Sequence, residues 1–217
     1  MEYRMYDNAK KGIGRIYFGE LLQILSTVLL CAGAVAAAIK EDEISHAKDL
    51  LDGGAGVLGI LLAGLLLMLV AFLFTFFGVK RAAKDEAGFN KALIFLVIGI
   101  IATIAEGILI NFSETAAEGV SIFNSLCDTL VTIFIIRGTM NLAENIGNMN
   151  VKKLGSSTLR MILLIYALII ALQVISLFFK GDSLTVVALI LLVAVAVLSV
   201  IAYILFLKML NQGRKML

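Results

Sequence analysis

Six long apolar stretches, separated by short polar segments, dominate the pattern of hydrophobic and polar positions along this chain. They cover residues 17–39, 55–79, 92–111, 119–136, 161–179 and 184–207. Each is close to the length of about 20 residues that a helix needs to cross a bilayer. Backbone groups in lipid must be hydrogen-bonded within the chain, and uninterrupted apolar runs achieve this as helices. The pattern therefore predicts an all-α, polytopic membrane protein with six transmembrane helices.

The connections between these stretches are short, so we expect one transmembrane helical-bundle domain over residues 1–217, built as three tandem antiparallel hairpins. Two polar segments, 43–52 and 139–150, carry apolar residues at helical spacing. Such spacing is typical of short amphipathic helices that lie on a membrane or on a partner. We predict one such helix in each segment.

Small residues at four-residue spacing occur in the first two spans. They include Ala32 with Ala36, Gly33 with Ala37, and the run Ala55, Gly59 and Ala63 with the neighbouring Gly64. Small side chains allow helices to approach closely in lipid. We therefore expect these residues to join the first two spans.

Basic residues are distributed very unevenly between the two sides of the predicted membrane. Only three of the 18 lysines and arginines, Lys40, Lys48 and Lys180, fall on the side of the first, third and fifth connections. The remaining 15 lie before the first span, in the second and fourth connections, and after the last span. Cytoplasmic loops are enriched in lysine and arginine. The distribution predicts a multi-pass protein of the plasma membrane with both termini in the cytoplasm.

Composition supports a lipid-embedded chain. Of the 217 residues, 61% are hydrophobic and 16% charged, and the mean hydropathy is +1.03. Soluble domains are about 45–50% apolar and about 25% charged. The net charge of +2 gives no basis for a nucleic-acid partner. Cys31 and Cys127 lie in apolar runs without ligand spacing, so we expect no metal and no cofactor.

Three acidic residues fall within the predicted spans: Glu20 near the inner boundary, and Glu106 and Asp128 deeper. Measured along a helix, Glu106 lies about 8 Å and Asp128 about 13 Å below the outer boundary. A charged acid at such depth costs roughly 2.5–3.5 kcal/mol. No lysine or arginine occurs within the six spans to neutralise it. Because their depths differ by about one helical turn, the two carboxyl groups can meet if the third and fourth spans pack together.

The fourth span carries a polar stripe at helical spacing, and its members supply most of the candidate site. Ser121, Asn124, Ser125, Asp128 and Thr132 share one face of a helix that is otherwise apolar. Oxygen atoms arranged in this way can coordinate a desolvated cation or relay a proton. The candidate ion or substrate site comprises Glu106, Asp128, Asn124, Ser125, Thr132 and Gln173. The alternative is that the stripe only joins helices, through hydrogen bonds worth about 0.6–2 kcal/mol each.

Two further groups of polar residues lie towards the inner side. Glu20, Gln23 and Thr27 share a face of the first span, and Tyr166 and Tyr203 lie at the depth of Thr132. They lie outside the candidate site.

Two classes of function fit these features. One is a small proton- or cation-coupled transporter or an ion-conducting protein, with a proton or sodium ion as its ligand. The other is a non-catalytic membrane scaffold or a subunit of a larger complex, including a substrate-binding component of an importer, which implies a homo-oligomer or a membrane partner. The motifs of catalytic nucleophiles, metalloproteases and phosphate-binding loops are missing from the sequence, so we do not expect an enzyme.

Overall fold

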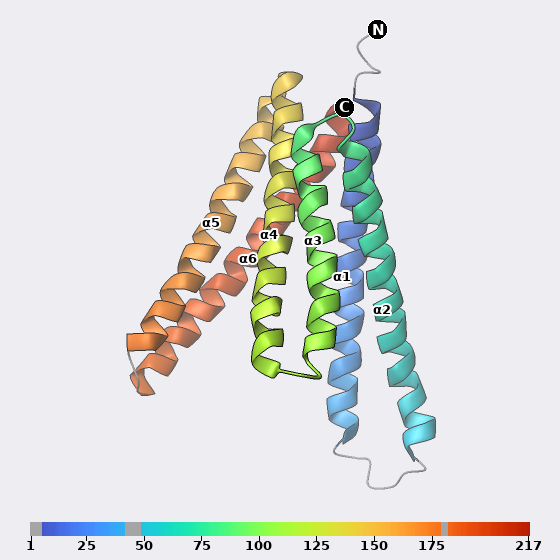
Figure 1. Ribbon diagram of the computed structural model, residues 1–217, viewed down its shortest axis with the longest axis vertical. Coiled ribbons are helices and arrows are strands. Elements are labelled where there is room, and N and C mark those ends of the chain that lie inside the picture. Colours follow the sequence, from blue (N-terminus) through green and yellow to red (C-terminus); the bar gives the residue numbers. More distant parts are fainter. Residues whose placement is uncertain (1–5, 42–48, 179–181) are drawn as a thin grey trace.

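The protein folds into six long α-helices, shown in a computed structural model (Figure 1). The structure describes residues 6–41, 49–178 and 182–217; within these ranges the side chains of residues 40–41, 49–55, 114, 170–178 and 182–190 are not described. The helices are α1 (Asp7–Glu41), α2 (Asp49–Ala82), α3 (Ala87–Leu109), α4 (Glu114–Asn145), α5 (Met149–Phe178) and α6 (Asp182–Met216). The described residues contain no strand, as the all-α prediction requires.

Five of the six helices, α1, α2, α3, α4 and α6, contain a described segment that is long and apolar enough to cross a membrane. The predicted fifth span, 161–179, lies largely on α5, but the side chains of residues 170–178 are not described. Every helix also exposes large apolar side chains. Examples are Val35, Leu66, Ile101, Ile122, Leu163 and Leu192, each at least 59% exposed. Exposed apolar surface of this extent suits a helical protein embedded in lipid.

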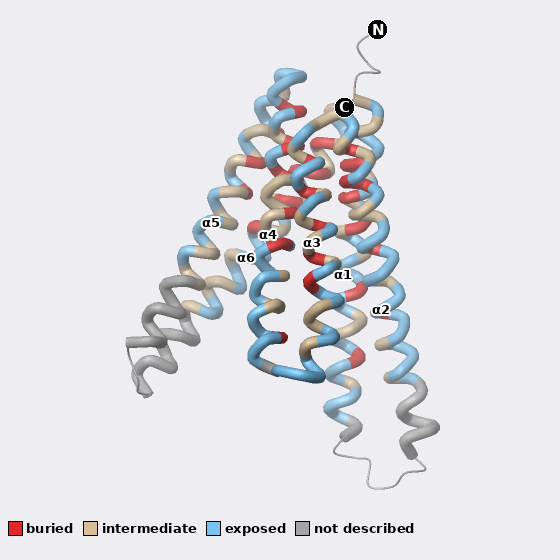
Figure 2. Tube along the Cα trace, viewed as in Figure 1, coloured by how far each residue is buried: buried red, intermediate tan, exposed pale blue. Residues whose placement is uncertain are grey.

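Buried side chains gather at one end of the bundle, where α1 begins and α6 ends (Figure 2). We call this the packed end. Ile13, Phe89, Leu142 and Met209 are fully buried there, and each lies just outside a predicted span. Water drives apolar side chains together outside the lipid, whereas lipid exerts no such force between helices. Towards the opposite end the helices separate, and α5 and α6 lean away from α3 and α4 (Figure 1).

Helices α1 and α2 pack along a line of small residues that repeats every seven positions. On α1 these residues are Gly12, Gly19, Ser26 and Gly33, all of which are buried. Gly12 lies against Gly78 on α2, and the buried Ser26 hydroxyl donates a 2.8 Å hydrogen bond to the Gly64 carbonyl. By contrast, Gly59 is exposed and nothing described lies near it. Gly33 and Gly64 therefore join the two helices as expected, but the four-residue pattern that includes Gly59 does not.

Glycines also mark the contacts among the other helices at the packed end. Gly88 at the start of α3 lies against Gly138 on α4, and the ring of Phe89 packs beside Gly138. Gly155 on α5 contacts Met140 on α4. Helix pairs α1–α2, α3–α4 and α5–α6 make the most extensive contacts in the bundle (Figure 1).

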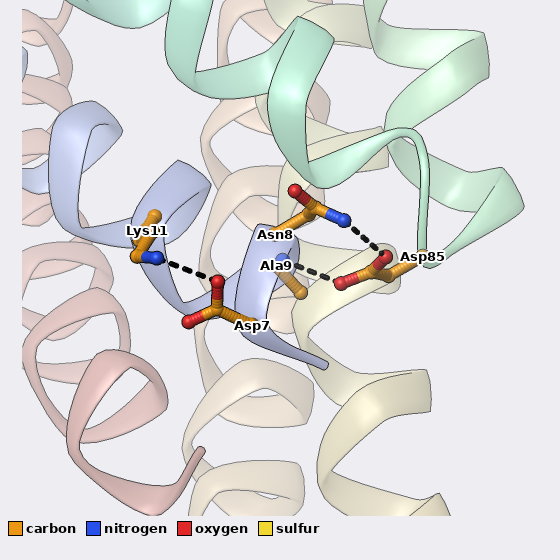
Figure 3. A network of polar contacts seen from close by, with 5 residues as sticks. All are labelled: Asp7, Asn8, Ala9, Lys11 and Asp85. Carbon is orange, nitrogen blue, oxygen red and sulfur yellow. Dashed lines mark hydrogen bonds and ion pairs between the residues drawn. The ribbon is translucent and has the colours of Figure 1, made fainter. Parts of the chain in front are cut away.

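The beginning of α1 is held by a carboxylate from the connection between α2 and α3 (Figure 3). Asp85 accepts hydrogen bonds from the Ala9 backbone N–H at 2.8 Å and from the Asn8 amide at 3.1 Å. The first backbone N–H groups of a helix have no partner within the helix, so Asp85 caps α1 from outside the helix. Lys11 donates to Asp7 at 2.6 Å on the surface, and this bond lowers the pKa of the Asp7 carboxyl.

The structure differs from the prediction of separate amphipathic helices. Residues 139–145 are the last turns of α4, and 149–150 begin α5. Gly147 in the connection adopts φ +74°, and the Asn148 side chain accepts from the Val151 N–H at 3.3 Å to cap α5. Of the three apolar residues at helical spacing in 139–150, Leu142 packs into the core, whereas Ile146 and Met149 are exposed. Residues 43–48 lie outside the described residues, and 49–52 belong to α2.

Candidate functional site

The polar stripe of the fourth predicted span lies on α4, and most of its hydroxyl groups are satisfied within that helix. Ser125 donates to the Ser121 carbonyl at 3.1 Å, and Thr132 donates to the Asp128 carbonyl at 3.1 Å. Such bonds satisfy a hydroxyl where no other polar group is available. Asn124 and Thr132 are half-buried, whereas Ser125 and Asp128 are exposed.

The contacts between α3 and α4 fix the relative depth of Glu106 and Asp128. Asn124 donates a 2.9 Å hydrogen bond to the Thr103 hydroxyl, and a Cβ built on Gly99 lies 3.8 Å from a carboxylate oxygen of Asp128. Thr103 is therefore opposite Asn124, and Gly99 is opposite Asp128. Glu106 lies three residues beyond Thr103, level with Ser121.

Glu106 and Asp128 are thus offset by about seven residues, or about 10 Å along the helices. The structure places no hydrogen bond between these two described side chains. The sequence predicts an offset of about one helical turn, so the structure places the two acids further apart along the helices than expected. Gln173 is on α5, and its side chain lies outside the described residues.

Glu20, which lies outside the predicted candidate site, is the intramembrane acid whose carboxylate has a hydrogen-bond partner among the described residues. The Tyr203 hydroxyl on α6 donates to a carboxylate oxygen of Glu20 on α1 at 2.8 Å and approaches the Glu20 carbonyl at 3.2 Å. Both residues are half-buried. Each lies three or four residues inside the inner end of its predicted span, so equal depth was the signal that could have paired them.

Tyr203 borders two cavities. One, of about 350 Å³, lies among α4, α5 and α6, and its polar groups are the hydroxyls of Thr129, Thr132, Tyr166, Ser199 and Tyr203. Within it Thr129 and Tyr166 share a hydrogen bond. The other, also about 350 Å³, lies beside α1 and includes Glu20, Gln23 and Thr27. The tyrosine ring therefore stands between a carboxyl-containing cavity and a hydroxyl-containing one.

This arrangement brings together polar groups from α1, α4, α5 and α6, and Glu20, Tyr203 and Thr132 lie at nearly the same depth. A carboxylate paired with a phenol can exchange a proton, and the neighbouring hydroxyls can accept or donate hydrogen bonds in turn. Within the described part of the chain, no group of three or more histidine, cysteine, aspartate or glutamate side chains could hold a metal ion. The two cysteines are unpaired, Cys31 exposed and Cys127 buried.

The fold and its exposed apolar surface define the class of this protein as a multi-pass, membrane-embedded helical bundle. No protein-family model, no curated protein and no solved structure matches the chain. Its particular function must therefore be inferred from its own residues.

Proposed function

We propose that the chain crosses the plasma membrane six times as three tandem antiparallel hairpins, with the packed end in the cytoplasm. The pairing of α1 with α2, α3 with α4 and α5 with α6 supports this topology. The common position of the beginning of α1 and the end of α6 supports it as well (Figure 1). The orientation rests on the excess of lysine and arginine in the connections at that end.

We propose that the protein moves protons or small cations, such as sodium, across this membrane. The observation that carries the proposal is the hydrogen bond between Glu20 and Tyr203, because it joins a carboxyl group to the hydroxyl groups of a second open cavity within a helical bundle suited to lipid. Ionisable residues within membrane spans are rare, and by default they mark ion or proton pathways.

The polar groups form a series that leads inward from the cytoplasmic side. Glu20, Tyr203 and Thr132 lie about 5–6 Å inside the inner ends of their predicted spans. Along α4, Asp128 follows at about 12 Å and Asn124 at about 18 Å. Ions or protons would pass from the Glu20 carboxyl to the hydroxyls around Tyr203 and then along the polar face of α4. Asp128 and Ser125 are exposed on this face of α4, so their polar groups remain free to contact an ion or water on the proposed path.

The test is flux into liposomes that contain the purified full chain, driven by a proton gradient or by a sodium gradient. Glu20→Gln removes the carboxylate, and Tyr203→Phe removes only its hydroxyl partner. Glu118→Gln is the matched control, because Glu118 is an exposed acid near the start of α4. We expect both site variants to reduce flux to the level of empty liposomes and the control to match the wild-type protein. Absence of flux from the wild-type protein, or equal flux from all variants, would exclude the proposal.

Asp128→Asn and Glu106→Gln separate the roles of the two deeper acids. Because Asp128 lies on the proposed path and Glu106 lies level with Ser121 near its outer end, we expect the larger loss of flux from Asp128→Asn. The reverse order would place the critical acid on α3 and contradict the proposed path.

A second candidate is a non-catalytic subunit or scaffold in a membrane complex, including a substrate-binding component of an importer. It is favoured by the cavity among α4, α5 and α6, whose walls are largely apolar and include Ile162, Ile165 and Phe206. A partner's apolar side chains fit such a cavity. Mild-detergent purification of the native protein that yields one defined partner, lost in an Ile165→Asn variant, would support this function. A lone monomer would count against this function. A homo-oligomer would also count against it if the Ile165→Asn variant showed the same flux as the wild-type protein.

A further inference from the structure

Three lysines line one groove at the packed end, between the beginning of α5 and the end of α6. Lys153 comes from α5, and Lys208 and Lys215 come from α6. The groove has a volume of about 500 Å³, and the amide side chains of Asn150 and Gln212 also line it. All three lysines are exposed, so their ammonium groups remain free to approach a ligand.

Among the described residues, this groove has no acidic side chain in its lining and its lysines form no ion pair. The neighbouring Lys152 behaves differently, because it pairs with Glu144 at 2.6 Å outside the groove. A second basic groove, containing Lys91 and Arg137, includes the carboxylate of Glu86. The three-lysine groove therefore concentrates positive charge with no compensating acid in its described lining, and it suits an anion.

The height of the groove identifies the kind of anion. Lys208 directly follows the predicted sixth span, and Lys215 lies seven residues, or about 10 Å, further from the hydrocarbon. The headgroup layer of one leaflet is roughly 5–8 Å thick. Lys208 therefore lies at the inner edge of this layer, and Lys215 and Lys153, about 10–12 Å from the hydrocarbon, lie just beyond its outer edge. Lysine side chains are long enough to reach phosphates in the layer from either side. Apolar groups of Leu154 and Met216 are also part of the groove.

We propose that this groove binds the phosphate headgroup of an anionic phospholipid of the cytoplasmic leaflet. The ammonium groups of Lys153, Lys208 and Lys215 attract the phosphate oxygens, and the Asn150 and Gln212 amides supply further hydrogen-bond donors. Basic clusters between membrane helices on the cytoplasmic side recognise anionic headgroups in this way. The bound lipid would hold α5 against α6 at the packed end. This site is separate from the Tyr203 site, and lipid binding is measured without any flux.

The test is a lipid titration of the detergent-solubilised full chain, followed by native mass spectrometry. The probes are phosphatidylglycerol, phosphatidylcholine and inorganic phosphate. We expect wild-type protein to retain phosphatidylglycerol more tightly than phosphatidylcholine. A single Lys→Gln change should weaken phosphatidylglycerol binding about fivefold, and the triple variant Lys153→Gln, Lys208→Gln, Lys215→Gln roughly a hundredfold.

The matched control is the triple variant Lys10→Gln, Lys80→Gln, Lys84→Gln, which removes three exposed lysines from the same end of the bundle. It should retain phosphatidylglycerol like the wild type, as should a Lys→Arg triple variant in the groove. Equal losses in the groove and control triples would overturn the proposal, because net charge alone would then explain binding. Displacement of the lipid by an equimolar amount of inorganic phosphate would also overturn it, by assigning the groove to a free anion.

Discussion

Replacing Gly12 with alanine puts a methyl group at the point where the backbones of α1 and α2 touch. A Cβ built at this position lies 2.6 Å from the Gly78 carbonyl oxygen and 2.7 Å from the Ala82 nitrogen. Ordinary contacts begin near 3.4 Å, so the helices must separate by about 0.8 Å locally. Both contacts are to backbone atoms, which cannot rotate away as the end of a side chain can.

The expected loss follows from two opposing effects. Overpacking of a tight interface typically costs 1–3 kcal/mol, while glycine to alanine within a helix contributes about 1 kcal/mol of stability. Gly14 isolates the second effect, because it is two residues away on the same helix and nothing described lies within 4 Å of its built Cβ. We expect Gly14→Ala to be neutral or stabilising and Gly12→Ala to be less stable than Gly14→Ala by about 1–3 kcal/mol.

The measurement is the free energy of unfolding in mixed micelles, from titration with a denaturing detergent and detection by circular dichroism. Gly78→Ala tests the same contact from the other helix, since its built Cβ lies 2.8 Å from the Gly12 carbonyl oxygen. It should lose as much stability as Gly12→Ala. If Gly12→Ala and Gly14→Ala proved equally stable, the close packing of α1 on α2 would be wrong.

Three more predictions use the same unfolding measurement. Asp85→Ala should reduce stability by about 0.5–2 kcal/mol, because it removes the cap of α1, whereas Asp7→Ala should leave the midpoint unchanged. Ser26→Ala should lose about 0.6–1.7 kcal/mol, since its hydroxyl bonds the Gly64 carbonyl across the helix pair. Thr75→Val should be neutral or stabilising, because the buried Thr75 hydroxyl has no hydrogen-bond partner among the described residues. A loss for Thr75→Val as large as that for Ser26→Ala would contradict the assignment of these two hydroxyls.

The packing of α1 on α2 shows how far a sequence pattern can be interpreted. Gly12, Gly19, Ser26 and Gly33 recur every seven residues, and this spacing is visible in the sequence. The prediction relies on small residues spaced four positions apart, and this pattern includes Gly59, which is exposed. A seven-residue repeat keeps one line of residues facing a partner helix over several turns. The signal was present, but only the structure distinguishes it from the other small residues in these spans.

The candidate site was predicted less completely than the spans. The polar face of α4 follows from helical periodicity alone, and Asn124 bonds Thr103 across the α3–α4 interface. The meeting of Glu106 and Asp128 depended on the relative depth of α3 and α4, and their observed offset of about seven residues, instead of the predicted four, keeps them apart. Glu20 lies near the inner boundary of its span, and equal depth is the sequence signal that relates it to Tyr203, 183 residues away. Depth alone does not show that two helices turn these side chains towards each other.

The sequence by itself determined that apolar helices dominate this protein and where they lie along the chain. Transfer from water to lipid is a property of each segment alone, so a sum over about 20 residues is enough to recognise it. Only the tertiary structure decided that Glu20 meets Tyr203, that three lysines share one groove, and that the core lies at the packed end. These features depend on helix rotation and relative depth, which arise from many small packing contacts between distant segments.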